Sequence, residues 1–156
     1  MSDKKYIYPK FLRLLHWDYS WPGYYFVTIC ADMKNPVFGK IVDDEMVLNE
    51  SGETVERIWN EIPSHFSGVE VDTFVVMPNH IHGIIIILGD EDGCELGLAT
   101  HASPLRKSGE SSSRGPHGPK RRSLGSIVGS FKSAVTREIN IQQGTPGTSV
   151  WQRNYY

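Results

Sequence analysis

Two histidines separated by a single residue stand between two apolar runs in the stretch VVMPNHIHGIIII, residues 75–87. Side chains alternate between the two faces of a β-strand, so His80 and His82 would point the same way and Ile81 the opposite way. The Cα atoms of the histidines would lie about 6.5 to 7 Å apart, which lets both imidazoles bind one divalent metal ion. The spacing therefore predicts a metal site; the structural alternative is two histidines that are hydrogen-bonded to their neighbours on a half-exposed strand.

The residues around the pair favour the metal site. Polar groups are costly inside an apolar sheet unless they have partners, and the apolar runs at 73–77 and 84–88 indicate a central strand region. Pro78-Asn79 predicts a turn or a β-bulge just before the pair, because proline cannot donate to a sheet ladder. Two histidines do not complete a catalytic metal site, and nearby acids such as Asp72 are candidates for a third ligand.

The charge is distributed unevenly along the chain, although its net value is only -2. Residues 1–100 hold 7 Lys and Arg against 16 Asp and Glu, whereas residues 101–156 hold 9 against 2. Clustered positive charge is typical of a protein that binds a phosphate backbone; the alternative is a solvated linker with incidental charge. The candidate nucleic-acid contacts are Lys120, Arg121, Arg122, Lys132 and Arg137.

The pattern of β-forming residues, turn residues and apolar spacing predicts the order of the elements. We expect a strand at 24–31, a hairpin at 37–48 with its turn at 43–45, a strand at 69–77, and a further strand that His80 opens. Between the hairpin and the strand at 69–77 we expect a helix that Asn49 or Ser51 caps and that Pro63 ends. Residues 89–122 are rich in Gly, Ser, Pro and charge and predict a flexible insertion, and residues 123–140 then form a second helix on one apolar stripe.

This order predicts one α+β domain over residues 1–156, with helices packed on one face of a mainly antiparallel sheet. A ferredoxin-like arrangement is the simplest fold of this kind. The chain shows neither regular βα alternation nor a glycine-rich phosphate loop. No signal peptide or membrane-spanning run is apparent, and Cys30 and Cys94 lack metal-ribbon or disulfide spacing. We therefore expect a cytoplasmic protein without a membrane partner.

Four segments, in order, resemble the HUH single-strand transposases, most closely the REP-associated tyrosine transposases and their insertion-sequence relatives. The segments are DYSWPGYYFVTIC, FVVMPNHIHGII, SLGSIVGSFKSAVTREIN and VWQRNYY. The match covers most of the chain, and residues 89–122 form a variable insertion within it. The HUH element falls on His80, Ile81 and His82, with Ile81 as the bulky hydrophobic residue.

The resemblance implies a ferredoxin-like palm, a Mg²⁺ or Mn²⁺ ion held by His80 and His82, and cleavage and rejoining of single-stranded DNA at hairpin-forming repeats. In such enzymes a tyrosine attacks the scissile phosphate and forms a 5′-phosphotyrosine link. The family continues after the WQ-x-x-Y-Y region into a further helix that carries this tyrosine and usually a third metal ligand. We therefore expect the nucleophile beyond residue 156, with Tyr156 as the fallback within the chain. A nucleoid-associated monomer or homodimer is expected.

Two other classes of function stay open. A non-catalytic module that binds single-stranded nucleic acid would use the sheet and the basic helix without needing the histidines. A small metal hydrolase would use the histidine pair on a substrate other than nucleic acid, and its binding to DNA would lack salt dependence.

Overall fold

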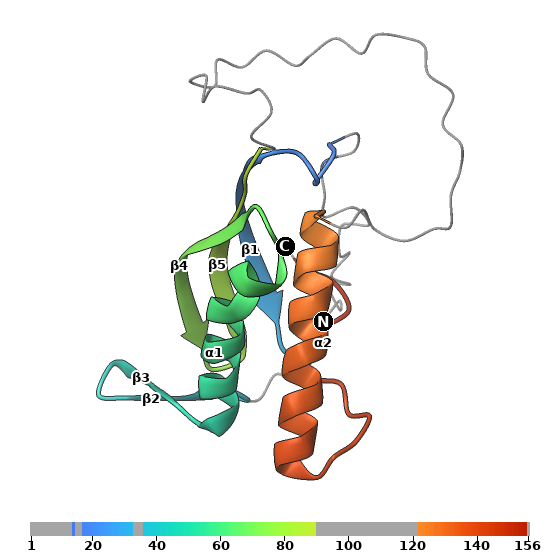
Figure 1. Ribbon diagram of the computed structural model, residues 1–156. Coiled ribbons are helices and arrows are strands. Elements are labelled where there is room, and N and C mark those ends of the chain that lie inside the picture. Colours follow the sequence, from blue (N-terminus) through green and yellow to red (C-terminus); the bar gives the residue numbers. More distant parts are fainter. Residues whose placement is uncertain (1–13, 15–16, 33–35, 90–121, 156) are drawn as a thin grey trace, which may run out of the picture.

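The fold is an antiparallel sheet with two helices on one of its faces, in the α+β class that the sequence predicts. The structure is a computed structural model that describes residues 14, 17–32, 36–89 and 122–155. The sheet has the strand order β1-β5-β4, and β2 pairs with β3 in a separate hairpin (Figure 1). The elements are β1 (Gly23–Cys30), β2 (Gly39–Val42), β3 (Glu45–Leu48), α1 (Glu50–His65), β4 (Val69–Met77), β5 (His80–Ile87) and α2 (Leu124–Gln143).

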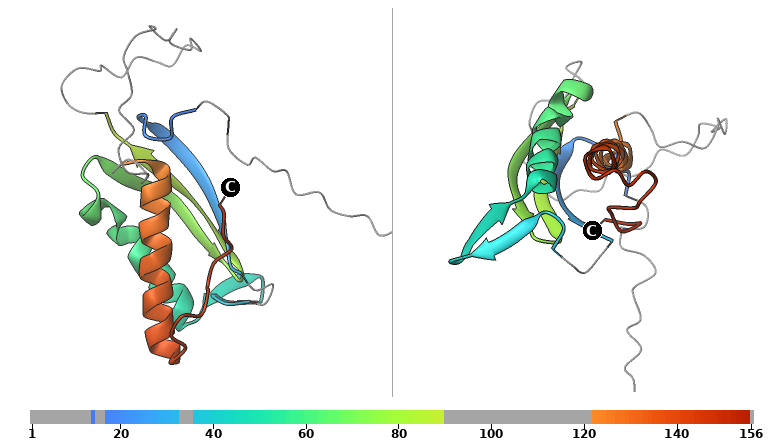
Figure 2. Two further views of the ribbon diagram at one scale, coloured as in Figure 1. Left: turned by 90° about the vertical axis from the view of Figure 1, so that its right-hand side faces the viewer. Right: turned by 90° about the horizontal axis from the view of Figure 1, so that it is seen from below.

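A short fourth pairing completes a ferredoxin-like topology. After α2 the chain returns to the free edge of β1, where Trp151 forms an isolated antiparallel bridge with Ala31. Across the sheet the order is then the Trp151 segment, β1, β5 and β4. Along the chain these strands and the helices follow a βαββαβ pattern, into which the β2–β3 hairpin is inserted before α1. Figure 2 shows the C-terminal segment beside β1, with both helices on the same side of the sheet.

The side chains of the central strand β5 alternate between the face of the sheet that the helices cover and an open face. Ile81, Gly83, Ile85 and Ile87 are buried under the helices, whereas the residues that alternate with them are half-exposed. The indole of Trp59 on α1 lies so close to the sheet that a Cβ at Gly83 would be 2.4 Å from it. Glycine is therefore required at this position for α1 to pack on β5.

The first helix does not end where the sequence predicts. We expected Pro63 to end it, but α1 continues to His65 with Pro63 inside its last turn. Because Pro63 lies close to the C-terminal end of the helix, its missing N–H removes only one helical hydrogen bond. The N–H of Phe66 still donates to the carbonyl of Ile62 at 3.2 Å. Within the described part of the chain, neither helix combines the length and the hydropathy needed to span a membrane.

The second helix begins at Leu124, one residue later than expected, with Ser123 as its N-cap, and ends three residues later than expected. Gly144 ends it in the left-handed conformation at φ 63°, and its N–H bonds back to the carbonyls of Asn140 and Ile141. The buried side-chain amide of Asn140 donates to the carbonyl of Thr148 at 3.0 Å. This bond ties the helix end to the segment that leads to Trp151.

The Pro78-Asn79 pair forms a two-residue turn between β4 and β5, with Met77 paired to His80. The β-bulge that was the other possibility lies elsewhere, in β4 between Val71 and Phe74. The turn is tied to neighbouring segments, because the carbonyl of Asn79 accepts from the N–H of Ala31 at 2.8 Å and the carbonyl of Pro78 accepts from Val37 at 2.7 Å. Residues 90–121, most of the expected insertion, lie outside the described residues.

Candidate functional site

The two histidines lie side by side on the open face of the sheet, which is the face opposite to α1 and α2. Their ring centroids are 4.8 Å apart and the ring planes are nearly perpendicular, at 81°. Ile81 between them is fully buried in the core. The prediction that both imidazoles share one face of a central strand is therefore confirmed.

Each imidazole is oriented by a hydrogen bond at Nδ1. Nδ1 of His82 lies 2.8 Å from Oγ1 of Thr28, its partner across the β1–β5 pair. Nδ1 of His80 lies 2.8 Å from Oδ1 of Asn79. Because an amide oxygen only accepts, Nδ1 of His80 carries the proton and Nε2 keeps its lone pair. Hydrogen-bonding one ring nitrogen in this way leaves the other available to a ligand, and it is the usual outer contact of a metal-binding histidine.

The protonation of His80 also suits a ligand role. Burial, and secondarily the neighbouring His82, lower the pKa of His80 below its ordinary value. A lower pKa favours the neutral imidazole near pH 7, and only the neutral ring can donate a lone pair to a metal ion.

A third protein ligand is not found among the described residues, which hold no group of three or more His, Cys, Asp or Glu side chains arranged for a metal ion. Asp72, the acid suggested from the sequence, is exposed at the bulge in β4 and does not join the histidine pair. Tyr156, the fallback nucleophile, lies outside the described residues. The part of the chain that the structure describes thus offers His80 and His82 as candidate metal ligands, without a third.

Lys132 of α2 reaches the end of β1 that pairs with the histidine-bearing end of β5. Its ammonium donates to the carbonyl of Gln152 at 2.5 Å, and the N–H of Gln152 donates to the carbonyl of Cys30 at 2.9 Å. Cys30 is the β-sheet partner of His80. Burial lowers the pKa of Lys132 and raises that of the Cys30 thiol. The chain of contacts brings a cation from α2 to the end of the sheet where Cys30 pairs with His80.

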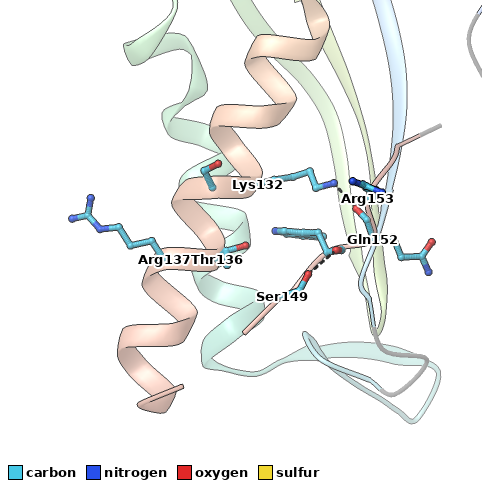
Figure 3. A pocket seen from close by; sticks show the side chains of 8 residues that line it. Lys132, Thr136, Arg137, Ser149, Gln152 and Arg153 are labelled. Atoms are coloured by element: carbon cyan, nitrogen blue, oxygen red, sulfur yellow. Dashed lines mark hydrogen bonds between the residues drawn. The ribbon is translucent and has the colours of Figure 1, made fainter. Parts of the chain in front are cut away.

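A shallow pocket of about 410 Å³ lies between α2 and the C-terminal segment (Figure 3). Its lining includes hydroxyl and amide side chains and three cations, Lys132, Arg137 and Arg153. In Figure 3 Lys132 and Arg153 lie close to Gln152, whereas Arg137 extends from α2 in the opposite direction. Sequence reasoning missed Arg153, since it is isolated in the sequence and only the return of the chain to β1 brings it to Lys132.

The other basic candidates are not at this edge of the sheet. Arg122 approaches Gly68 so closely that a Cβ added there would lie 3.0 Å from its guanidinium. Gly68 precedes Val69, which pairs with Ile87 at the end of the sheet opposite to His80. Lys120 and Arg121 lie outside the described residues. The structure therefore brings Lys132 to the histidine end of the sheet and places Arg122 at the other end.

The open face also carries two aromatic side chains that the sequence reading treated as ordinary strand residues. Tyr24 and Phe26 on β1 are 71% and 65% exposed. The ring of Phe26 stacks on that of His82, with centroids 5.5 Å apart and planes 19° apart. Alternating β formers predicted the strand, but only its pairing with β5 shows that Phe26 adjoins the histidine pair.

The overall fold is similar to that of a solved protein, the structure of a REP-associated tyrosine transposase bound to a REP hairpin. The two share a TM-score of 0.53 at 12% sequence identity, over 95% of this chain and 60% of that one. At this identity the likeness shows a shared fold, and this chain spans about three fifths of the length of that structure. The ferredoxin-like, palm-type architecture that the sequence resemblance implied is thereby confirmed.

Sequence comparison gives a nearer relative. No protein-family profile matches the chain. An uncharacterized protein of Haemophilus influenzae (strain ATCC 51907 / DSM 11121 / KW20 / Rd) is 40% identical over 146 residues, which cover 93% of this chain and 74% of that protein. The chain therefore belongs to the same protein family as this Haemophilus influenzae protein.

Proposed function

We propose that the protein takes part in metal-dependent cleavage and strand transfer of single-stranded DNA at hairpin or repeat sequences, as a relative of the HUH transposases. One observation carries the proposal: two imidazoles lie side by side on an open sheet face, and Thr28 and Asn79 hold both Nδ1 atoms. The fold shared with a tyrosine transposase bound to a REP hairpin supports DNA as the substrate class.

The resemblance implies Mg²⁺ or Mn²⁺, and two imidazole nitrogens suit a divalent transition-metal ion better than Mg²⁺, which prefers oxygen ligands. His80 and His82 would hold it through Nε2, and further positions would be filled by water, by phosphate oxygens or by a ligand from outside the described residues. A divalent ion bound here supplies Lewis-acid polarisation of the scissile phosphate. Lys132 and Arg153 would attract the phosphate backbone beside the histidines, because both are cations at the edge of β1.

In the proposed reaction a tyrosine hydroxyl attacks the phosphorus of a DNA phosphodiester. The new bond joins phosphorus to the tyrosine oxygen, the bond from phosphorus to the 3′ oxygen breaks, and the proton lost by the tyrosine ends on the departing 3′ oxygen. The nucleophile is either Tyr156 or a tyrosine of a segment beyond it. Rejoining reverses these steps with a different 3′-hydroxyl.

Covalent capture of DNA tests the proposal. The chain is incubated with Mn²⁺ and a 5′-labelled or 3′-labelled single-stranded hairpin, and a denaturing gel is examined for a protein–DNA band. With a chain that contains the nucleophilic tyrosine, we expect a band with the 3′-labelled strand that disappears in His80→Ala and persists in His65→Ala, a control histidine on the exposed end of α1. Loss of the band in Tyr156→Phe would assign the nucleophile, whereas a band that survives His80→Ala would contradict the metal site.

The second candidate is a module that binds single-stranded DNA without cutting it. The observation that favours it is that the described residues offer two candidate metal ligands and no third. DNA binding without a covalent band, unaffected by EDTA and by His80→Ala with His82→Ala, would support this candidate over strand transfer.

A further inference from the structure

Tyr24 and Phe26 form an exposed aromatic pair on β1, and packing of the core does not account for it. The strand alternates, so that Tyr25 and Val27 face the helices while Tyr24 and Phe26 face outward. Large aromatic side chains bury much area on contact, so two that are 71% and 65% exposed on one strand mark a surface suited to a partner.

The aromatic pair is continuous with the proposed site. The Phe26 ring is nearly parallel to that of His82, with a centroid separation of 5.5 Å. The aromatic pair and the histidine pair therefore form one continuous surface. Thr28, the next outward residue of β1, holds Nδ1 of the same histidine. A strand of DNA with its phosphate at the histidines would therefore place its neighbouring bases over Phe26 and Tyr24.

The distribution of charge favours a path along β1. Lys132 and Arg153 lie beside the Cys30 end of β1, and the exposed acids Glu70 and Asp72 lie on β4, with β5 between the two strands. A polyanion that follows β1 stays near the cations and away from these acids. Unpaired bases suit this surface because each has a flat π-face that stacks on aromatic rings without regard to sequence.

We propose that Phe26 and Tyr24 form a stacking platform for the unpaired bases of single-stranded DNA next to the histidine pair. The platform rests on the proposed function, since it requires that the protein binds DNA. It adds residues and a contact type that the histidines and cations do not supply.

The test separates base stacking from phosphate binding. Binding of a labelled oligothymidine and of an abasic strand of the same length is measured by fluorescence anisotropy in EDTA, so that no metal contributes. We expect Phe26→Leu to raise the Kd for oligothymidine between about fivefold and a hundredfold, since stacking on one base contributes about 1 to 3 kcal/mol. Phe26→Tyr should keep the parental Kd, and the abasic strand should bind the parent and Phe26→Leu equally.

Val75→Ala is the matched control. Val75 on β4 is 44% exposed and pairs with His82 from the side of β5 opposite to β1. Its replacement by alanine therefore removes exposed apolar surface but no aromatic ring. We expect its Kd to stay within about twofold of the parent, because an aliphatic side chain offers no π-face for stacking. Far-UV circular dichroism and thermal melting establish that each variant is folded.

Three results would overturn the platform. Equal affinity of the parent and Phe26→Leu for oligothymidine would remove it while leaving salt-dependent DNA binding, and with it the proposed function, intact. A parental dimer that Phe26→Leu dissociates without a change in DNA affinity would make this face an interface between copies of the chain. A parent that binds neither strand at any salt concentration, either in EDTA or with Mn²⁺, would overturn the proposed function as well.

Discussion

At the residue scale, the site depends on two uncharged neighbours as much as on the imidazoles. Thr28 and Asn79 each lie 2.8 Å from an Nδ1 atom, and these two contacts orient the rings. The two contacts differ in origin. Asn79 adjoins His80 in the chain, whereas Thr28 lies on the neighbouring strand β1 and is paired with His82 on β5. The sequence could suggest the first of these contacts, but the second depends on the register between residues 54 apart.

Removing the hydroxyl of Thr28 should weaken metal binding without unfolding the protein. Thr28→Val keeps the shape and the β-branching of the side chain, and loss of an outer hydrogen bond of this kind typically lowers metal affinity by about tenfold to a hundredfold. Isothermal titration with Mn²⁺ measures the effect. Thr28→Ser retains the hydroxyl and should bind within a few fold of the parent; equal losses in the two variants would show that the hydrogen bond does not matter.

At the scale of elements, the position of α1 depends on the absence of a side chain at Gly83. A Cβ there would lie 2.4 Å from Cζ2 and 2.7 Å from Cη2 of Trp59, and the indole also stacks on Phe74 at 4.6 Å and meets Phe131 edge-on. The indole cannot move without disturbing both contacts. The same strand carries His82 one residue away, so the packing of α1 supports the strand that holds the site.

Gly83→Ala should therefore lower the free energy of unfolding, by about 1 to 3 kcal/mol for overpacking of a core. Urea denaturation followed by tryptophan fluorescence and circular dichroism measures it. Gly129→Ala on α2 is the control, because nothing lies within 4 Å of its added Cβ, and alanine in a helix is favoured over glycine by about 0.5 to 1 kcal/mol. A Gly83→Ala variant as stable as the parent would mean that Trp59 has room to shift.

The elements were largely predictable, whereas their partners were not. The bounds of β4 and the start of β5 agree with the sequence because two β-branched runs flank a Pro-Asn turn. The end of α1 was wrong because proline was treated as a stop, although in the last turn its cost is small. The proximity of Lys132, Arg153 and Cys30 has no local signal, since it arises when the chain returns to β1 after α2.

At the scale of the whole molecule, three of the described cations of the C-terminal third lie at opposite ends of the sheet. Lys132 and Arg153 lie at the histidine end, and Arg122 lies near Gly68 at the other. DNA that is held at the histidines should therefore depend on the first two. A net charge of -2 conceals this arrangement, which becomes visible only when the folded surface is considered.

Lys132→Ala should reduce the salt dependence of DNA binding. Each lost phosphate contact lowers the slope of log affinity against log salt by about 0.7 to 1, so the variant should bind less steeply as well as more weakly. Anisotropy titrations over a range of salt concentrations give the slope. Lys40→Ala, which removes an exposed cation from the β2–β3 hairpin, should leave it unchanged. A parental slope of zero would instead favour a metal hydrolase with a substrate other than nucleic acid.

The two-residue length of the Pro78-Asn79 turn has a consequence for how the protein can vary. Because strand side chains alternate with a period of two, inserting or deleting one residue here while the turn stays two residues long would shift the register of β5 by one residue and exchange its faces. Both imidazoles would then be driven beneath Trp59, and Ile81 would be presented to solvent. Changes of length in this family should therefore be excluded at this turn, even where substitutions of its residues are accepted, because its residue count sets which face the histidines occupy.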